Sequence, residues 1–338
     1  MKPLCMNTLS SSALRFVVVG ALLSFAALSP AQAQSDVQKQ LSAAPFTIIS
    51  PFPPGGPVDT LARILSQGLT KRYGQPAVVE NLAGAAGNIG MEKVKRAKPD
   101  GRTLLVVPAG NLTINPTLMN PFPFNIEKDF VPVTMLAKAP NVLVASPASG
   151  IKNASELVAA AKAKPGTLSF ASPGVGSGLH LAGELFKQQA GVDLLHVPYK
   201  GTPQAINDVL GGAVPLMFSN LPAALPFIQS GKLVAIGITE AKRTPVAPNI
   251  PTLAEQGIQG INVTSWYGLL APAGTPPAVV EQLAKDAAEI LAQPDVRDNL
   301  KTQGMTGAAM KPAEFAAAMR DETAVWAQII KARHIVAE

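Results

Sequence analysis

The chain is poor in cysteine, histidine, aromatic and charged residues. Its 338 residues include one Cys and three His, and only 5% are aromatic and 15% charged. One Cys excludes a disulfide framework and a cysteine-rich metal site, and a multi-histidine metal centre would need nearly all of the histidines. The net charge of +6 is mild and no long Lys/Arg run is present, so we expect no nucleic-acid partner. Hydrophobic residues make up 47%, which excludes a disordered chain, and the length allows two domains.

Residues 1–33 have the pattern of a secretory signal. Two basic residues and no acidic one accompany an apolar run over residues 16–28, and Ala31-Gln32-Ala33 forms a small-residue cleavage site. The alternative is an uncleaved N-terminal anchor, although the run is shorter than the roughly 20 residues of a membrane span. Removal of this segment takes away Cys5 and leaves 26 basic against 22 acidic residues, a net charge of +4. We therefore expect a periplasmic protein, cleaved near Ala33, that does not itself span the membrane.

Strand-like apolar runs alternate with helical patterns through the rest of the chain, which is typical of an α/β fold. In residues 57–73, apolar side chains recur on one helical face and Pro57 suits the first turn. The predicted strands are 46–49, 77–80, 103–107, 142–145, 168–170, 195–197, 214–218 and 233–238. The predicted helices are 57–73, 88–98, one from Asn153 to before Pro165, 179–190, one starting at Thr202, 277–292 and 312–331.

Two crossings that carry proline and glycine, near residues 132–141 and 260–275, are the best candidates for domain boundaries. They predict a discontinuous first lobe made of residues 34–138 and 263–338. The second lobe is then residues 139–262. No repeat of fixed period and no low-complexity linker interrupts this organisation.

Three predicted strand-to-helix turns, at residues 50–59, 171–180 and 198–204, are candidate ligand sites. In open α/β sheets, ligands bind beyond the carboxyl ends of the strands, where helix N-termini offer unpaired N–H groups that suit a carboxylate. The alternative is that these are ordinary short turns without a ligand. If they bind one, close backbone approach and hydroxyl donors would come from Gly55, Gly56, Gly174, Gly176, Gly178, Ser172, Ser177 and Thr202.

No common enzyme motif is complete in the chain. Residues 174–178 read Gly-Val-Gly-Ser-Gly, so Gly176 stands where a G-x-S-x-G nucleophile turn needs serine. There is no GK[ST] phosphate loop, no H-E-x-x-H and no well-formed G-x-G-x-x-G, and we expect no catalytic residue, no metal and no cofactor. Ser177 and His180, three residues apart at a helix start, could share a face as nucleophile and base. Capping by Ser177 with a buried or site-lining His180 is the favoured alternative.

A series of short motifs runs through nearly the whole chain. They are PFPPGGPVDTLAR at 51–63, GQPAVVEN at 74–81, GNIG at 87–90, PDGRTLL at 99–105, HLAGELF at 180–186, HVPYKG at 196–201, LGG at 210–212 and WYGLLAPAGTP at 266–276. In this set and order the chain resembles the Bug-type substrate-binding receptors of tripartite tricarboxylate transporters. It departs from their pattern at Leu82 and Ala86, where the family commonly has an Arg and one member of a Gly-Gly pair. The missing Arg removes one charge near this loop, and the extra methyl groups narrow the site.

The resemblance implies two α/β lobes, each a mixed sheet flanked by helices, that close on a ligand like a flytrap in the type II periplasmic binding-protein topology. It also implies a small carboxylate ligand between the lobes and delivery of that ligand to a membrane permease, and we expect a monomer. Carried over from the family, the contacts are Phe52, Gly55, Gly56, Asp59, Ala85 and Asn111 in the first lobe, and Ser172, Gly176, Ser177, His180, Thr202 and Asn220 in the second. For Asp59 the alternative role is to cap its helix.

Two other functions stay open at this point. The first is a secreted serine hydrolase that uses Ser177 and His180, which loss of turnover in a Ser177→Ala variant would reveal. The second is a ligand sensor, in which the closed lobes contact a signalling ectodomain in place of a permease. The identity of the carboxylate is also open, because no Arg can be placed as a clamp for a second carboxylate.

Overall fold

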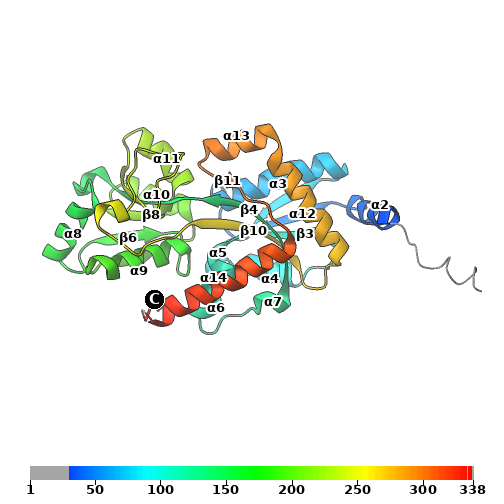
Figure 1. The fold of residues 1–338 in the computed structure, drawn as a ribbon, viewed down its shortest axis with the longest axis horizontal. Helices are drawn as coiled ribbons and strands as arrows, with labels where there is room; N and C mark the ends of the chain where they lie inside the picture. Colours follow the sequence, from blue (N-terminus) through cyan, green and yellow to red (C-terminus); the bar gives the residue numbers. More distant parts are fainter. Residues whose placement is uncertain (1–29, 333, 337–338) are drawn as a thin grey trace, which may run out of the picture.

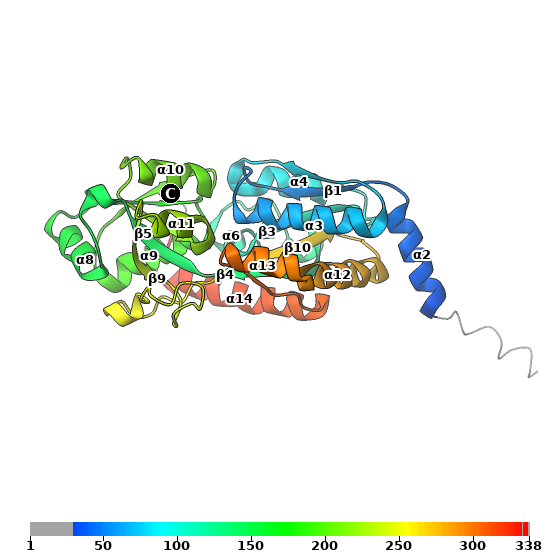
Figure 2. The same cartoon turned by 90° about the horizontal axis from the view of Figure 1, so that it is seen from above.

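The computed structural model of the protein describes residues 30–332 and 334–336 (Figure 1). Residues 1–29, which hold most of the predicted secretory signal, lie outside the described residues. The predicted cleavage site falls at the start of α2 (Pro30–Ser42), so cleavage near Ala33 stays a prediction. In Figures 1 and 2, α2 extends away from the rest of the molecule at its N-terminal end, while Leu41 near its C-terminal end belongs to the core and Val37 packs against it. No helix in the described range is long and apolar enough to cross a membrane.

The chain forms two mixed β-sheets. The larger has the order β11-β4-β10-β3-β1-β2, and the smaller has the order β7-β6-β8-β5-β9. The strands of the larger sheet are β1 (Phe46–Ser50), β2 (Ala77–Asn81), β3 (Thr103–Pro108), β4 (Phe130–Ala139), β10 (Ser265–Pro272) and β11 (Thr306–Gly307). Those of the smaller sheet are β5 (Asn141–Ala145), β6 (Ser169–Ser172), β7 (Leu195–Pro198), β8 (Leu216–Asn220) and β9 (Val234–Ile238).

The two sheets repeat one arrangement. In the larger sheet β1 pairs in parallel with β2 and β3, and β10 joins antiparallel between β3 and β4. In the smaller sheet β6 pairs in parallel with β7 and β8, and β5 joins antiparallel between β8 and β9. Parallel neighbours need crossover connections, and helices supply them. The predicted fold of two α/β lobes, each a mixed sheet flanked by helices, is confirmed.

Helices cover both faces of each sheet. On the larger sheet, α3 (Pro57–Tyr73) and α12 (Pro277–Ala292) enclose one apolar cluster, and α4 (Asn88–Lys95), α5 (Ala109–Thr113) and part of α14 (Pro312–Ala332) enclose the other. On the smaller sheet, α8 (Ala154–Ala163) and α9 (Gly178–Ala190) cover one face, and α10 (Thr202–Leu210) and α11 (Leu221–Gln229) cover the other. The remaining α-helices of the described range are α6 (Asn115–Leu118), α7 (Ile126–Asp129) and α13 (Pro294–Thr302), and short 3-10 helices lie at Ala85–Gly87, Pro147–Ser149 and Ala254–Gln256.

The two predicted crossings contain long strands. Most of the 132–141 crossing belongs to β4, and β10 lies inside the 260–275 crossing. Their pairing shifts register twice, between Tyr267 and Gly268 and between Leu269 and Leu270, and Pro132 lies opposite Leu270. Proline and glycine are tolerated at such bulges, which is why a proline- and glycine-bearing segment still forms a strand. The division of the chain into two lobes at these residues stays a prediction.

Helix α14 packs against both halves of the molecule. Phe315 and Met319 belong to an apolar cluster of the larger sheet, whereas Trp326 and Ile330 belong to a cluster of the smaller sheet. Figures 1 and 2 show this helix (red) running along the molecule beneath both halves. It therefore contributes side chains at the junction of the two sheets.

Candidate ligand-binding site

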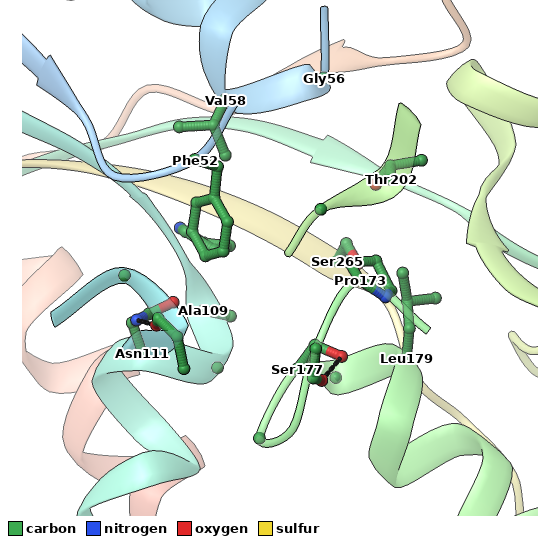
Figure 3. A pocket seen from close by; sticks show the side chains of 18 of the residues that line it. Phe52, Gly56, Val58, Ala109, Asn111, Pro173, Ser177, Leu179, Thr202 and Ser265 are labelled. Carbon is green, nitrogen blue, oxygen red and sulfur yellow. Dashed lines mark hydrogen bonds between the residues drawn. The ribbon is translucent and has the colours of Figure 1, made fainter. Parts of the chain in front are cut away.

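A cavity of about 320 Å³ lies between the two halves of the molecule. Its wall combines the turn after β1, the loop 84–87, helix α5, the loop 173–179, the turn 198–203, the start of β10 and part of α14. Figure 3 shows Phe52 and Val58 on one side, with Ser177 and Thr202 across from them. Most of the lining is apolar, and among the described lining residues the charged side chains are Lys200 and Glu322. This size and composition fit a small organic ligand.

Several helices start at this cavity. Gly56, Ser177 and Gly201, the N-cap residues of α3, α9 and α10, all line it. The N-caps of α4, α5 and α11 line it as well, because in both sheets the strands lead into helices at the edge that faces the other sheet. The first-turn N–H groups of a helix have no partner within the helix, and its dipole is positive there. The cavity wall therefore suits an anion.

The loop 173–178 is shaped by Ser177 and Gly176. The Ser177 hydroxyl accepts from the His180 backbone N–H at 3.1 Å and donates to the Gly174 carbonyl at 2.8 Å, so it caps α9. Gly176 has φ +75°, and a Cβ there would lie 1.8 Å from Asn115 Oδ1. Only glycine allows the loop to approach α6 this closely.

Two stacked histidines support the same loop from behind. His180 Nδ1 accepts from the Gly176 N–H at 3.3 Å, and His196 Nε2 lies 2.7 Å from Ser172 Oγ. The two imidazole rings stack with centroids 4.2 Å apart. Burial, together with the charges of His196 and Lys187, lowers the pKa of His180 to about 3, and burial with the Lys187 charge lowers the pKa of His196 to about 4. Both rings are therefore neutral near pH 7.

This geometry favours the capping alternative over a nucleophile–base pair. The Ser177 hydroxyl is engaged with two backbone groups, whereas the buried His180 ring faces the Gly176 N–H and the other histidine. A general base must reach the hydroxyl whose proton it removes, and the interactions recorded among the described residues do not join the two side chains. Ser177 therefore caps α9 and lines the cavity, and it is not placed as a nucleophile.

Asp59 closes the turn that leads into α3. Its carboxylate accepts from the Gly55 N–H at 3.1 Å, from Arg63 Nε at 2.9 Å and from Asn81 Nδ2 at 3.0 Å. Burial opposes ionisation, but these hydrogen bonds outweigh it and lower the pKa of Asp59. The side chain thus holds in shape the turn that leads into α3.

The loop 84–87 carries unusual backbone geometry. Ala85 and Ala86 have φ values of +47° and +53°, a region that side chains other than glycine rarely adopt. Asn111 Nδ2 donates to the Ala86 carbonyl at 2.7 Å and so fixes this loop against α5. Ala86 lines the cavity, whereas Leu82 packs against an apolar cluster of the larger sheet. Of the two departures from the family pattern, the one at Ala86 therefore changes the cavity wall, whereas the one at Leu82 changes the packing behind it.

Asn220 hydrogen-bonds to both chain segments that connect the two sheets. Its Nδ2 donates to Asn141 Oδ1 at 2.9 Å and to Ser265 Oγ at 2.8 Å, and Ser265 Oγ donates to Asn141 Oδ1 at 2.8 Å. Asn141 begins β5 directly after β4, and Ser265 begins β10. The three side chains form one hydrogen-bonded group at the base of the cavity, where β4 and β10 pass between the halves.

The structure divides the residues predicted for the site into two groups. Those that line the cavity are Phe52, Gly56, Ala85, Asn111, Gly176, Ser177, Thr202 and Asn220. Those absent from the lining, which lie in or behind the same turns, are Gly55, Asp59, Ser172 and His180. Lining residues that sequence reasoning did not propose as contacts include Lys200, Ser265, Trp266, Tyr267, Glu322 and Trp326. The family motifs contain Lys200, Trp266 and Tyr267, so the motifs could have pointed to these residues as contacts. Glu322 lies outside the motifs, in an ordinary amphipathic helix.

Comparison with known proteins identifies the same family along most of the chain. Residues 61–335 match the family model described as "Tripartite tricarboxylate transporter family receptor". The protein BugT of Bordetella pertussis is 37% identical over 290 residues, which cover 86% of this chain and 89% of BugT.

Two solved structures are similar over nearly their whole length. The periplasmic binding protein BugD is 34% identical with a TM-score of 0.81, and the match covers 87% of this chain and 99% of that one. A protein of R. palustris with adipate is 31% identical with a TM-score of 0.84, and the match covers 87% of this chain and 98% of that one. These neighbours agree with the two-lobe fold of a periplasmic binding protein.

Proposed function

The chain belongs to the tripartite tricarboxylate transporter family of receptors, and we propose that it captures a small organic carboxylate in the periplasm and delivers it to a membrane permease. The family is one of substrate-binding receptors and not of enzymes, so the serine-hydrolase alternative does not apply. Two observations support a carboxylate as the ligand. One is the cavity between the halves, and the other is the similar solved structure that contains adipate, which is itself a carboxylate.

The observation that carries the proposal is the convergence of helix N-termini on this cavity. Helices α3, α9 and α10 run for 17, 13 and 9 residues from N-caps in the cavity wall. Each presents first-turn N–H groups to a carboxylate bound there, and the positive ends of the dipoles favour its charge. Because α3 comes from one half and α9 and α10 from the other, one carboxylate can bridge the two halves.

In this proposal the hydroxyl group of Thr202 adds a direct hydrogen bond to the carboxylate. Ser177 lines the cavity on the same side (Figure 3), but its one hydroxyl proton is donated to the Gly174 carbonyl, so Ser177 shapes the loop that presents the first-turn N–H groups of α9. A hydrogen bond to a charged group is stronger than a neutral one, so the Thr202 hydroxyl contributes to affinity as well as to orientation. Phe52, across the cavity, contacts the apolar part of the ligand.

Close contacts between the halves support a closed arrangement around the ligand. A Cβ on Gly110 of α5 would lie 2.4 Å from the Gly176 carbonyl oxygen, and a Cβ on Gly201 would lie 3.1 Å from Pro53 Cδ. The two halves thus approach each other closely at two places in the cavity wall. A ligand that bridges them would stabilise this closed arrangement and present a new surface to the permease.

Binding is tested by thermal unfolding and calorimetry with a panel of mono-, di- and tricarboxylates. At least one acid should raise the unfolding temperature, since ligand at 100 times its dissociation constant adds about 2.7 kcal/mol. Thr202→Val should weaken binding of that acid by roughly tenfold or more, because the variant loses a hydrogen bond to a charged group. Thr302→Val, at the exposed end of α13, is the matched control. A panel without any stabilising acid would contradict the proposal.

Delivery to a permease is tested separately. Cells that express a tripartite-type permease should take up the stabilising acid only when this receptor is supplied in the periplasm. If the loaded receptor bound a signalling ectodomain and supported no uptake, the permease part of the proposal would be wrong while carboxylate binding stood.

A further inference from the structure

Glu322 brings a negative charge to the wall of the carboxylate cavity. It lies on α14, is half-buried, and is the acidic side chain among the described lining residues. A carboxylate in the wall repels a carboxylate ligand that comes close to it.

The Glu322 carboxylate is held in place by two tryptophan donors. Oε2 accepts from Trp266 Nε1 at 2.5 Å, and Oε1 accepts from Trp326 Nε1 at 3.1 Å. The Thr113 hydroxyl lies 3.3 Å from Oε1, but its one proton has a nearer acceptor in the Ala109 carbonyl at 3.1 Å. The chain contains two tryptophans, and both donate to this one carboxylate. They come from β10 and α14, so neighbouring elements orient the side chain. A carboxylate oxygen has room for about two hydrogen bonds, which leaves Oε2 able to accept one more.

No basic side chain neutralises this carboxylate among the described residues. The two tryptophan donors and the nearby Thr113 hydroxyl are uncharged, and none of the ion pairs in the described range includes Glu322. The basic residue of the cavity, Lys200, is exposed and lies two residues before Thr202, beside the N-terminus of α10. The cavity wall therefore combines helix N-termini that attract an anion with one acidic side chain that no recorded ion pair neutralises.

We infer that Glu322 determines ligand specificity by excluding a second carboxylate, so that the ligand is a monocarboxylate with an apolar body. This inference rests on the proposed carboxylate binding. The first carboxylate binds at the helix N-termini, and the rest of the ligand extends along the apolar wall toward Trp266 and Glu322. A remote methyl group is tolerated there, and a remote hydroxyl group can donate to Oε2. A remote carboxylate meets a like charge in a partly dehydrated site, where repulsion is stronger than in water.

The test compares matched straight-chain acids of four to eight carbons: monocarboxylates, their ω-hydroxy derivatives and α,ω-dicarboxylates. Calorimetry on the wild-type protein should show, at each length, that the dicarboxylate binds about tenfold or more weakly than the monocarboxylate, with hexanoate and adipate as the central pair. Glu322→Gln keeps the size of the side chain and removes its charge. It should strengthen binding of the dicarboxylate that reaches this side chain by about tenfold and change binding of the monocarboxylate by less than about threefold.

Glu281→Gln is the matched control, because Glu281 is exposed on α12 and absent from the cavity lining. It should leave every affinity unchanged. If the wild-type protein binds dicarboxylates at least as tightly as monocarboxylates, the inference is wrong and carboxylate binding itself stands. The wild-type comparison gives this answer even if Glu322→Gln fails to fold. If no acid of either kind binds, the proposed function fails and the specificity role fails with it.

Discussion

Acidification from pH 7 to pH 5 should destabilise the protein through its two buried histidines. His180 and His196 are 1% and 6% exposed, and burial lowers their pKa values to about 3 and about 4. In the unfolded chain a histidine has a pKa near 6.5. Between these values the unfolded chain binds protons that the folded protein does not. The stability contributed by the neutral rings is therefore complete above pH 6.5 and is lost as the pH falls toward 4.

The expected size of the effect follows from the difference in bound protons. Each histidine changes the free energy of unfolding by about 1.36 kcal/mol per pH unit between its two pKa values. From pH 7 to pH 5 this amounts to about 2 kcal/mol for each ring and about 4 kcal/mol for the pair. Such a loss is a large share of the 5–15 kcal/mol by which domains are typically stable.

Urea unfolding at pH 7, 6 and 5 measures this loss directly. His196→Asn removes one ring, and its loss of stability between pH 7 and pH 5 should be smaller than that of the wild-type protein by about 2 kcal/mol. The third histidine of the chain, His334, is exposed, so His334→Gln should follow the wild-type curve. Equal pH dependence of the wild-type protein and His196→Asn would refute the reasoning.

Three further predictions concern packing and backbone geometry. Gly110→Ala puts a Cβ 2.4 Å from the Gly176 carbonyl oxygen of the opposite half, so calorimetry should show carboxylate binding weakened by tenfold or more; unchanged affinity would exclude the closed contact. Ala86→Gly relieves a residue at φ +53° and should raise the free energy of unfolding in urea by about 0.5–1 kcal/mol, whereas a decrease would argue against strain there. Asp286→Ala removes a fully buried carboxylate that accepts from Arg72, Tyr73 and Gln282, and should cost about 3 kcal/mol in the same assay; a cost below about 1 kcal/mol would contradict its role in joining α3 to α12.

Local sequence signals predicted most of the parallel strands and their crossover helices. Helix α3 begins at Pro57 and ends at Tyr73, as predicted, and Gly74 adopts a left-handed conformation at its C-cap. Strands β4 and β10 were missed because proline and glycine within them indicate breaks. Their pairing across the sheet, with bulges at these positions, outweighs the local signal.

The candidate site was predictable where it depends on turns. Strand-to-helix turns with glycine and hydroxyl residues form one cavity because the topology brings their strand ends together. The sequence could not separate residues that line the cavity from those that support it, such as Asp59 and His180, because both kinds lie in the same turns. Glu322 carried no signal, since its contact with Trp266 joins residues 56 positions apart and depends on how α14 crosses the two halves.

The most direct test of carboxylate binding is a crystal structure of the protein with hexanoate or another stabilising acid. The carboxylate oxygens should lie within hydrogen-bond distance of first-turn N–H groups of α3 on one half and of α9 or α10 on the other, with the apolar chain directed toward Trp266. A carboxylate found elsewhere, or one bound to a single half with the cavity empty, would contradict the account.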